Sequence, residues 1–194
     1  MALGRPRDFC TEAALDTALK LFWKKGYEGT SLTDLTREMG INRPSLYAAF
    51  GNKESLFRKA LDRYIQQKSA LTEAAYSEPT IRGGVEKLLY GLLGDGTEEC
   101  RGCMAVQAAL VCGEASESIK QELADYRAAS EAKFRERLIR AQKEGELPKD
   151  ADPADLARYI YTIVQGIAVQ SAGGANRDEL KRVIDMAMRA WPSA

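Results

Sequence analysis

Residues 30–53, TSLTDLTREMGINRPSLYAAFGNK, constrain the fold more than any other part of this 194-residue chain. Ser31 can cap a first helix, and Gly40 stands where a helix would end in a left-handed residue. Asn42 can cap a second helix, in which Pro44 is acceptable because the first turn needs no amide donor. The pattern predicts two short helices joined by a tight turn, a helix-turn-helix.

The second of these helices has one polar and one apolar face. Leu46 and Phe50, four residues apart, face inward, whereas Arg43, Ser45 and Tyr47 face outward. Helix-turn-helix geometry also occurs as plain packing, and Tyr47 could be a core aromatic. Leu46 and Phe50 already provide the apolar face of this helix, so Tyr47 is not needed in the core. We therefore interpret the outward face as a surface that reads DNA.

The longer segment YEGTSLTDLTREMGINRPSLYAAFGNKESLF resembles the DNA-binding domain of Tet repressor (TetR) family transcription regulators, over roughly residues 8–60. The resemblance implies an all-helical homodimer that binds a near-palindromic operator in double-stranded DNA, usually as a repressor released by a small-molecule ligand. It also implies base contacts from Arg43, Pro44 and Ser45, and phosphate contacts from Tyr47, Lys53 and Thr33.

Charge is distributed unevenly along a chain whose formal net charge is zero. Residues 1–70 hold 12 Lys/Arg and 8 Asp/Glu, and residues 71–194 hold 16 and 20. An N-terminal region that is basic, followed by a region that is acidic, is typical of a protein that binds nucleic-acid phosphates through one end only. Arg5 and Arg7 lie in a short N-terminal arm. This arm either contacts DNA, by reaching into a minor groove or lying along phosphates, or is a disordered terminus.

Several classes of function lack their usual residues. The sequence contains no histidine, which removes Ser-His-Asp and Cys-His catalysis and any histidine-containing metal site. It also lacks a Walker loop and a dinucleotide-binding glycine motif. We therefore expect no enzyme activity and no cofactor. With no secretion signal or membrane span recognisable, we expect a cytoplasmic protein that contacts no membrane.

Apolar periodicity predicts an all-α fold of about nine helices in two domains. Residues 1–52 would form a three-helix DNA-binding domain, and residues 53–194 an effector-binding and dimerisation domain. The expected helices cover about residues 8–25, the two in 30–53, 53–75, 80–93, 104–111, one from 116 to just before 145, one from 152 and one over 176–191.

The last two helices are the expected dimer interface. The segment ARYIYTIVQGIAVQSAGG is apolar on more than one face, so the helix must be buried on several sides. Pairing both helices with their copies in a second subunit would bury this surface in a four-helix interface. The alternative is that both pack inside one monomer.

The resemblance also implies a ligand pocket among the fourth to eighth helices. Polar candidates that could orient a partly polar ligand are Gln107, Tyr126 and Tyr161. The other candidates are apolar or aromatic, and each could equally be a core residue: Tyr64, Leu89, Leu92, Met104 and Phe134.

The four cysteines include a pair, Cys100 and Cys103, with the spacing of metal ligands. A zinc site would need further donors and there is no histidine, so we expect no metal. The adjacent Arg101 and a helix start near Cys103 favour the thiolate form, which suggests a thiol switch. The segment is also weakly similar to TetR members that sense oxidants or electrophiles. The alternative is that these are ordinary thiols.

The sequence therefore favours a ligand-responsive repressor that acts as a dimer. The alternative is a DNA-binding activator or architectural protein without a small-molecule effector.

Overall fold

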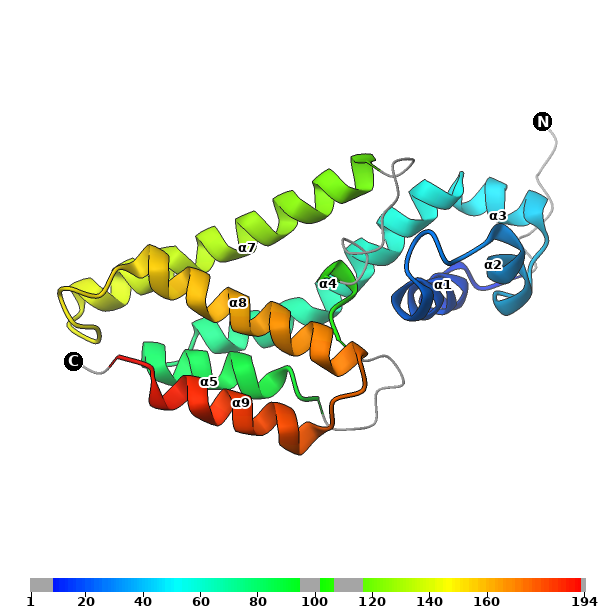
Figure 1. The fold of residues 1–194 in the computed structure, drawn as a ribbon. Helices are drawn as coiled ribbons and strands as arrows, with labels where there is room; N and C mark the ends of the chain where they lie inside the picture. Colours follow the sequence, from blue (N-terminus) through cyan, green and yellow to red (C-terminus); the bar gives the residue numbers. More distant parts are fainter. Residues whose placement is uncertain (1–8, 95–101, 107–116, 193–194) are drawn as a thin grey trace.

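The computed structural model describes residues 9–94, 102–106 and 117–192, and within these ranges the fold is all-α with no strand. The molecule is elongated, with a small helical head at one end and a larger helical body at the other (Figure 1). This confirms the all-α fold class.

The head consists of α1 (Thr11–Lys25), α2 (Leu32–Glu38) and α3 (Arg43–Phe50), closed by the first turns of α4 (Lys53–Tyr76). Phe57 of α4 is fully buried, and its ring meets Phe22 of α1 edge-on at 5.1 Å between centroids. Aromatic pairs in this geometry add to the free energy of burial. The head core therefore depends on α4 as much as on its own three helices.

Local signals set the turn between α2 and α3. The amide of Asp34 donates to Ser31 Oγ at 3.0 Å, and that of Ser45 donates to the Asn42 side chain at 2.8 Å. Gly40 has a φ of 66°, a left-handed conformation that side-chain-bearing residues rarely adopt. The predicted helix-turn-helix is confirmed in each of these details.

The body contains α5 (Ile81–Gly91), α7 (Glu117–Lys143), α8 (Pro153–Ala172) and α9 (Arg177–Arg189). Figure 1 shows α7 and α8 along one side of the body, with α5 and α9 along the other. A second core fills the space between them. It includes Leu89, Phe134, Leu138, Ile160 and Ile184, all at most 1% exposed.

Helices α4 and α5 approach each other so closely that a side chain would not fit between them. A Cβ atom added to Gly84 would lie 2.6 Å from the carbonyl oxygen of Ala75. Helix α4 continues from the head into this contact. Its 24 residues therefore join the two cores as one continuous rod.

Helix ends differ from the sequence prediction by a few residues. Helix α1 begins at Thr11, and α5 ends at Gly91 because Leu92 and Leu93 bond to carbonyls three residues back. Of the helix expected over residues 104–111, Met104–Val106 is helical and the remainder lies outside the described residues. No helix in the described ranges is long and apolar enough to span a membrane.

Removal of the Phe57 ring should destabilise the head. We expect Phe57→Ala to lower the free energy of unfolding by about 3–5 kcal/mol, because it leaves a cavity beside Phe22. Urea denaturation at a fixed protein concentration measures this. Ile139→Ala, at a side chain that is 38% exposed, is the matched control and should cost less than about 1 kcal/mol. Equal losses in the two variants would contradict this assignment of the core.

Candidate nucleic-acid interface and ligand cavity

Helix α3 presents the side chains that the sequence placed outward. Arg43, Pro44 and Tyr47 are exposed and Ser45 is partly exposed. Leu46 and Phe50 are buried at 0% and 3% exposure and anchor the opposite face to the head core. A rod with one anchored and one free face is the form that enters a major groove.

Arg43 is held by a neighbour that is distant in sequence. Its Nη2 donates a hydrogen bond to Thr33 Oγ1 at 3.1 Å, so a residue of α2 orients the guanidinium of α3. The sequence placed both residues at the interface separately. Their contact, across ten positions and the turn, could not be recognised from local patterns.

Lys53 stands at the first position of α4, behind the Asn52 cap. Its ammonium nitrogen lies 4.3 Å from the centroid of the Tyr27 ring, a cation–π contact. Partial burial lowers the pKa of Lys53, and the charge of Glu28 opposes this shift. The aromatic support fixes the lysine beside the reading helix. The two arm residues, Arg5 and Arg7, lie outside the described residues.

An ionic cluster joins the start of α4 to the start of α7. Arg58 contacts Glu54 at 2.6 Å and Glu122 at 2.7 Å, and Ser118 Oγ donates to Glu54 at 2.8 Å. Hydrogen bonds from Ser118 and Arg58 lower the pKa of Glu54. The cluster connects the base of the head to the body at a second place, beside the continuous helix.

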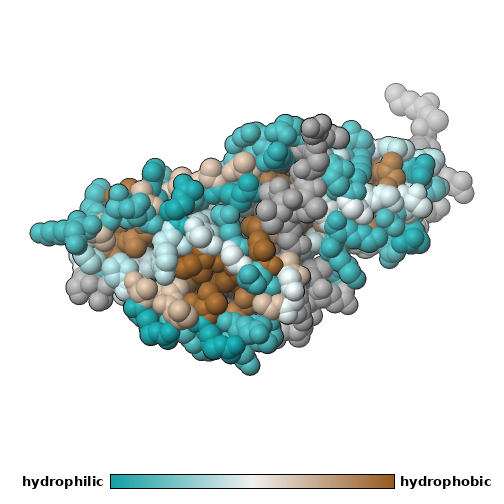
Figure 2. Space-filling view, in the orientation of Figure 1, coloured by the Kyte–Doolittle hydropathy of each residue, from teal (hydrophilic) through white to brown (hydrophobic). Residues whose placement is uncertain are grey.

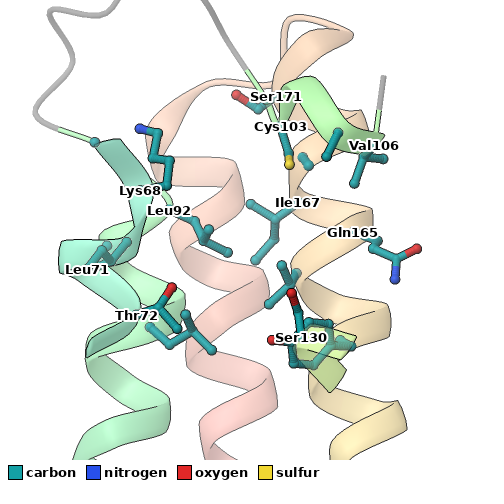
Figure 3. Close-up of a pocket in the computed structure, with 18 of the residues that line it drawn as sticks. Lys68, Leu71, Thr72, Leu92, Cys103, Val106, Ser130, Gln165, Ile167 and Ser171 are labelled. Carbon is teal, nitrogen blue, oxygen red and sulfur yellow. The ribbon is translucent and has the colours of Figure 1, made fainter. Parts of the chain in front are cut away.

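A cavity of about 640 Å3 lies in the body between α4, α5, α7 and α8, with the start of α9 at one end (Figure 3). This volume is typical of a site for a small organic molecule. Four of the predicted ligand contacts line it: Tyr64, Leu92, Tyr126 and Tyr161.

The other predicted contacts do not line this cavity. Leu89, Met104 and Phe134 are at most 1% exposed and belong to the two cores. Gln107 lies outside the described residues.

The polar lining missed by the sequence analysis follows from helical geometry. Lys68 is four residues after Tyr64, Ser130 four after Tyr126, and Gln165 four after Tyr161, so each shares a face with a predicted tyrosine. Their position one helical turn after a predicted tyrosine is the sequence signal for Lys68, Ser130 and Gln165.

The tyrosines of the cavity keep their protons. Burial is the main cause that raises the pKa of Tyr64, Tyr76, Tyr126 and Tyr161. A neutral phenol both donates and accepts hydrogen bonds, so the cavity offers groups of this kind to a bound molecule.

Cys103 lines the same cavity, is partly buried and packs against the core cluster that contains Tyr64. Tyr64 in turn meets Trp23 of α1 edge-on at 4.9 Å between ring centroids. A short chain of contacts therefore leads from the cavity to the head. Cys100, the other half of the predicted pair, lies outside the described residues.

A third surface lies on α8 and α9. Tyr159 and Val169 of α8 and Val183 and Met186 of α9 are 39–62% exposed, although both helices also bury apolar residues inside the monomer. Figure 2 shows apolar surface gathered on this face of the body. Exposed apolar patches of this kind mark protein–protein contacts.

Two family models match the sequence. One, described as bacterial regulatory proteins of the tetR family, covers residues 14–60, and the other, a tetracyclin repressor-like C-terminal domain, covers residues 94–187. The HTH-type transcriptional repressor ComR of Escherichia coli (strain K12) is 35% identical, over 97% of this chain and 92% of ComR. YezE of Bacillus subtilis (strain 168), an HTH-type transcriptional regulator, is 32% identical over 96% and 98%.

A solved structure resembles the whole chain. It is the TetR family transcriptional regulator CifR, with cysteines substituted, in complex with 26-base-pair double-strand operator DNA. It is 41% identical, with a TM-score of 0.92 over 97% of this chain and 100% of that one.

Proposed function

Because this chain belongs to the TetR family of bacterial transcription regulators, we propose that it represses transcription as a homodimer on a near-palindromic operator. The observation that carries this proposal is the exposed face of α3, with Arg43 oriented by Thr33. Residues 1–52 act as the DNA-binding domain, and residues 53–194 bind the effector and the second subunit. The boundary falls at the start of α4, whose first turns complete the head.

The residues of the interface have two roles in the proposal. Arg43, Pro44 and Ser45 contact base edges, and the guanidinium of Arg43 suits the two acceptors of a guanine. Tyr47, Lys53 and Thr33 contact phosphates, which set the orientation and most of the salt dependence. Arg5 and Arg7 add contacts from the arm.

The apolar residues exposed on α8 and α9 support the proposed dimer interface. Two copies of this face would form a four-helix contact and bury Val183 and Met186. One reading helix contacts few base pairs. Two helices related by a twofold axis reach successive major grooves about 34 Å apart, which multiplies specificity.

Release from DNA follows from the shared helix. Tyr64 and Lys68 of α4 line the cavity, and the same helix begins at Lys53 beside the reading head. A ligand that binds more tightly when α4 is in one position than in another shifts the equilibrium toward that position. Because the helix is continuous, its cavity end and its head end move together. The cavity favours this effector-responsive regulator over an activator or architectural protein that has no effector.

A thiol modification at Cys103 is a second route to release. The thiolate adds to the β-carbon of an enone while the α-carbon takes a proton, or peroxide transfers an oxygen to sulfur and leaves as water. Either product enlarges a side chain that contacts Tyr64, and through it Trp23 of the head.

Arg43→Ala should change the preferred DNA sequence rather than abolish binding. We expect preference to relax at particular positions of each half-site, by about 1–3 kcal/mol. Selection from a random DNA pool, followed by competition with single-base variants, measures this. Arg140→Ala, on the exposed side of α7, is the control. An unchanged preferred sequence in Arg43→Ala would refute the assignment of the reading face.

Lys53→Ala should weaken binding to all sequences alike and lower the slope of log K against log salt by about 1 for each subunit. Tyr47→Phe removes only a neutral hydroxyl, so it should weaken binding while leaving the slope unchanged. Fluorescence anisotropy titrations over a range of salt concentrations distinguish the two effects. If Lys53→Ala kept the slope of the parent protein, a phosphate contact by this residue would be excluded.

Treatment with peroxide or an enone should release DNA from the parent protein but not from Cys103→Ser, alone or combined with Cys100→Ser. Cys10→Ser is the matched control, because Cys10 is exposed at the start of α1 and does not line the cavity. Release should therefore persist in that variant. Equal release from Cys103→Ser, the double variant and the parent would eliminate the thiol switch.

A further inference from the structure

The first turns of α7 take part in the junction between the head and the body. Ile119 and Leu123 of α7 are 0% exposed and belong to the same core as Phe57 and Leu61 of α4. Burial of these two side chains holds the start of α7 against the part of α4 that closes the head. The head is therefore supported by two helices of the body rather than by the continuous helix alone.

Arg58 of α4 fastens this junction from its polar edge. Its Nε donates to Glu122 Oε1 at 2.7 Å and its Nη2 donates to Ser118 Oγ at 3.2 Å, both on α7. The same Nη2 lies 2.6 Å from Glu54 Oε1 on its own helix. An isolated surface ion pair contributes little, but a planar guanidinium that binds three partners beside a buried contact has one favoured geometry. Arg58 therefore fixes how α4 is oriented against α7.

Arg58 lies near the proposed DNA contacts but is already occupied by anions. It follows Lys53 by less than two helical turns, and its guanidinium is bound to the carboxylates of Glu54 and Glu122. Two carboxylates outweigh one guanidinium, so this cluster does not attract a phosphate. Arg58 can affect DNA binding through the position of the head, not through a contact with DNA.

The position of the head matters because an operator with two half-sites requires a fixed separation between two reading helices. These helices must reach successive major grooves about 34 Å apart. One added base pair moves a half-site by about 3.4 Å along the DNA axis and rotates it by roughly 35°. A head that tilts on its body tolerates such an insertion, whereas a head that is held in place does not.

We propose that Arg58 is a positioning residue for operator binding. By binding Glu122 and Ser118 of α7, it sets the separation of the two heads of the dimer, and with it the half-site spacing that the protein accepts. This inference rests on the proposed function, in which the chain binds a near-palindromic operator as a dimer, and adds the contact that determines the spacing.

Glu122→Gln separates positioning from simple electrostatics. The variant loses a negative charge near the DNA, so an electrostatic effect alone would strengthen binding. Positioning predicts the opposite sign: affinity for the optimally spaced operator should fall by about three- to tenfold, without a loss of affinity for a duplex that carries one half-site. Discrimination against operators with one base pair inserted or removed between the half-sites should fall by a similar factor. Fluorescence anisotropy titrations with these duplexes measure both quantities.

Asp125→Asn is the matched control, because it removes the same charge from the same helix. Asp125 accepts a hydrogen bond from Gln121 of α7 itself, so the spacing preference of this variant should equal that of the parent. The double variant Arg58→Met/Glu122→Gln keeps the net charge of the parent and should show the relaxed spacing of Glu122→Gln. A spacing preference like that of the parent in Glu122→Gln, or an equal loss on the half-site and the full operator, would overturn the proposal.

The position of the head can also be measured without DNA. Nitroxide labels on Cys10, exposed at the start of α1, and on Lys149→Cys, in a loop that Gln142 holds to α7, report the distance between head and body. The other three cysteines are replaced by serine, and an excess of unlabelled chain suppresses distances between subunits. Pulsed dipolar spectroscopy should give a broader distance distribution for Glu122→Gln than for the parent. Equal widths would refute the inference.

Failure of this inference is distinguishable from failure of the proposed function. A broader distribution in a chain that selects no duplex from a random pool supports the positioning role of Arg58 and contradicts repression. A parent that selects a spaced operator, with a Glu122→Gln variant that keeps both the spacing and the narrow distribution, retains the proposed function and loses the positioning residue.

Discussion

Helix α4 is shared between two hydrophobic cores, and the rest of the architecture depends on that sharing. Phe57, near its start, completes the core of the head, whereas Ala75, near its end, belongs to the core of the body. Neither core would be closed if the helix were broken between them. The continuity that stabilises the molecule is therefore also what makes the position of the head depend on the packing of the body.

Tyr64 lies at the middle of this shared helix and takes part in three interactions. It lines the cavity, contacts Cys103 and packs edge-on against Trp23 of α1. The Arg58 cluster connects α4 to α7 six residues before Tyr64. A change at the cavity wall thus meets two rigid connections to the head, one aromatic and one ionic, rather than a flexible linker.

The head could be predicted from sequence because its helix caps and its turn depend on residues close together in the chain. The cavity lining could be predicted less well because it depends on helices that are far apart in the chain. Ser31, Gly40 and Asn42 each act within a few residues, and the structure has each in the expected role. Whether Leu89 or Phe134 faced a ligand or the core depended on helices far along the chain, which periodicity alone cannot orient. The polar lining contributed by Lys68, Ser130 and Gln165 was missed because such residues look like ordinary surface positions until their helices are placed around the cavity.

The contact at Gly84 fixes the spacing of two of the helices that bound the cavity. Because the backbones of α4 and α5 touch there, that point of contact tolerates almost no change in side-chain volume. A displacement of α4 therefore carries α5 with it, so the two helices respond to the contents of the cavity as one unit.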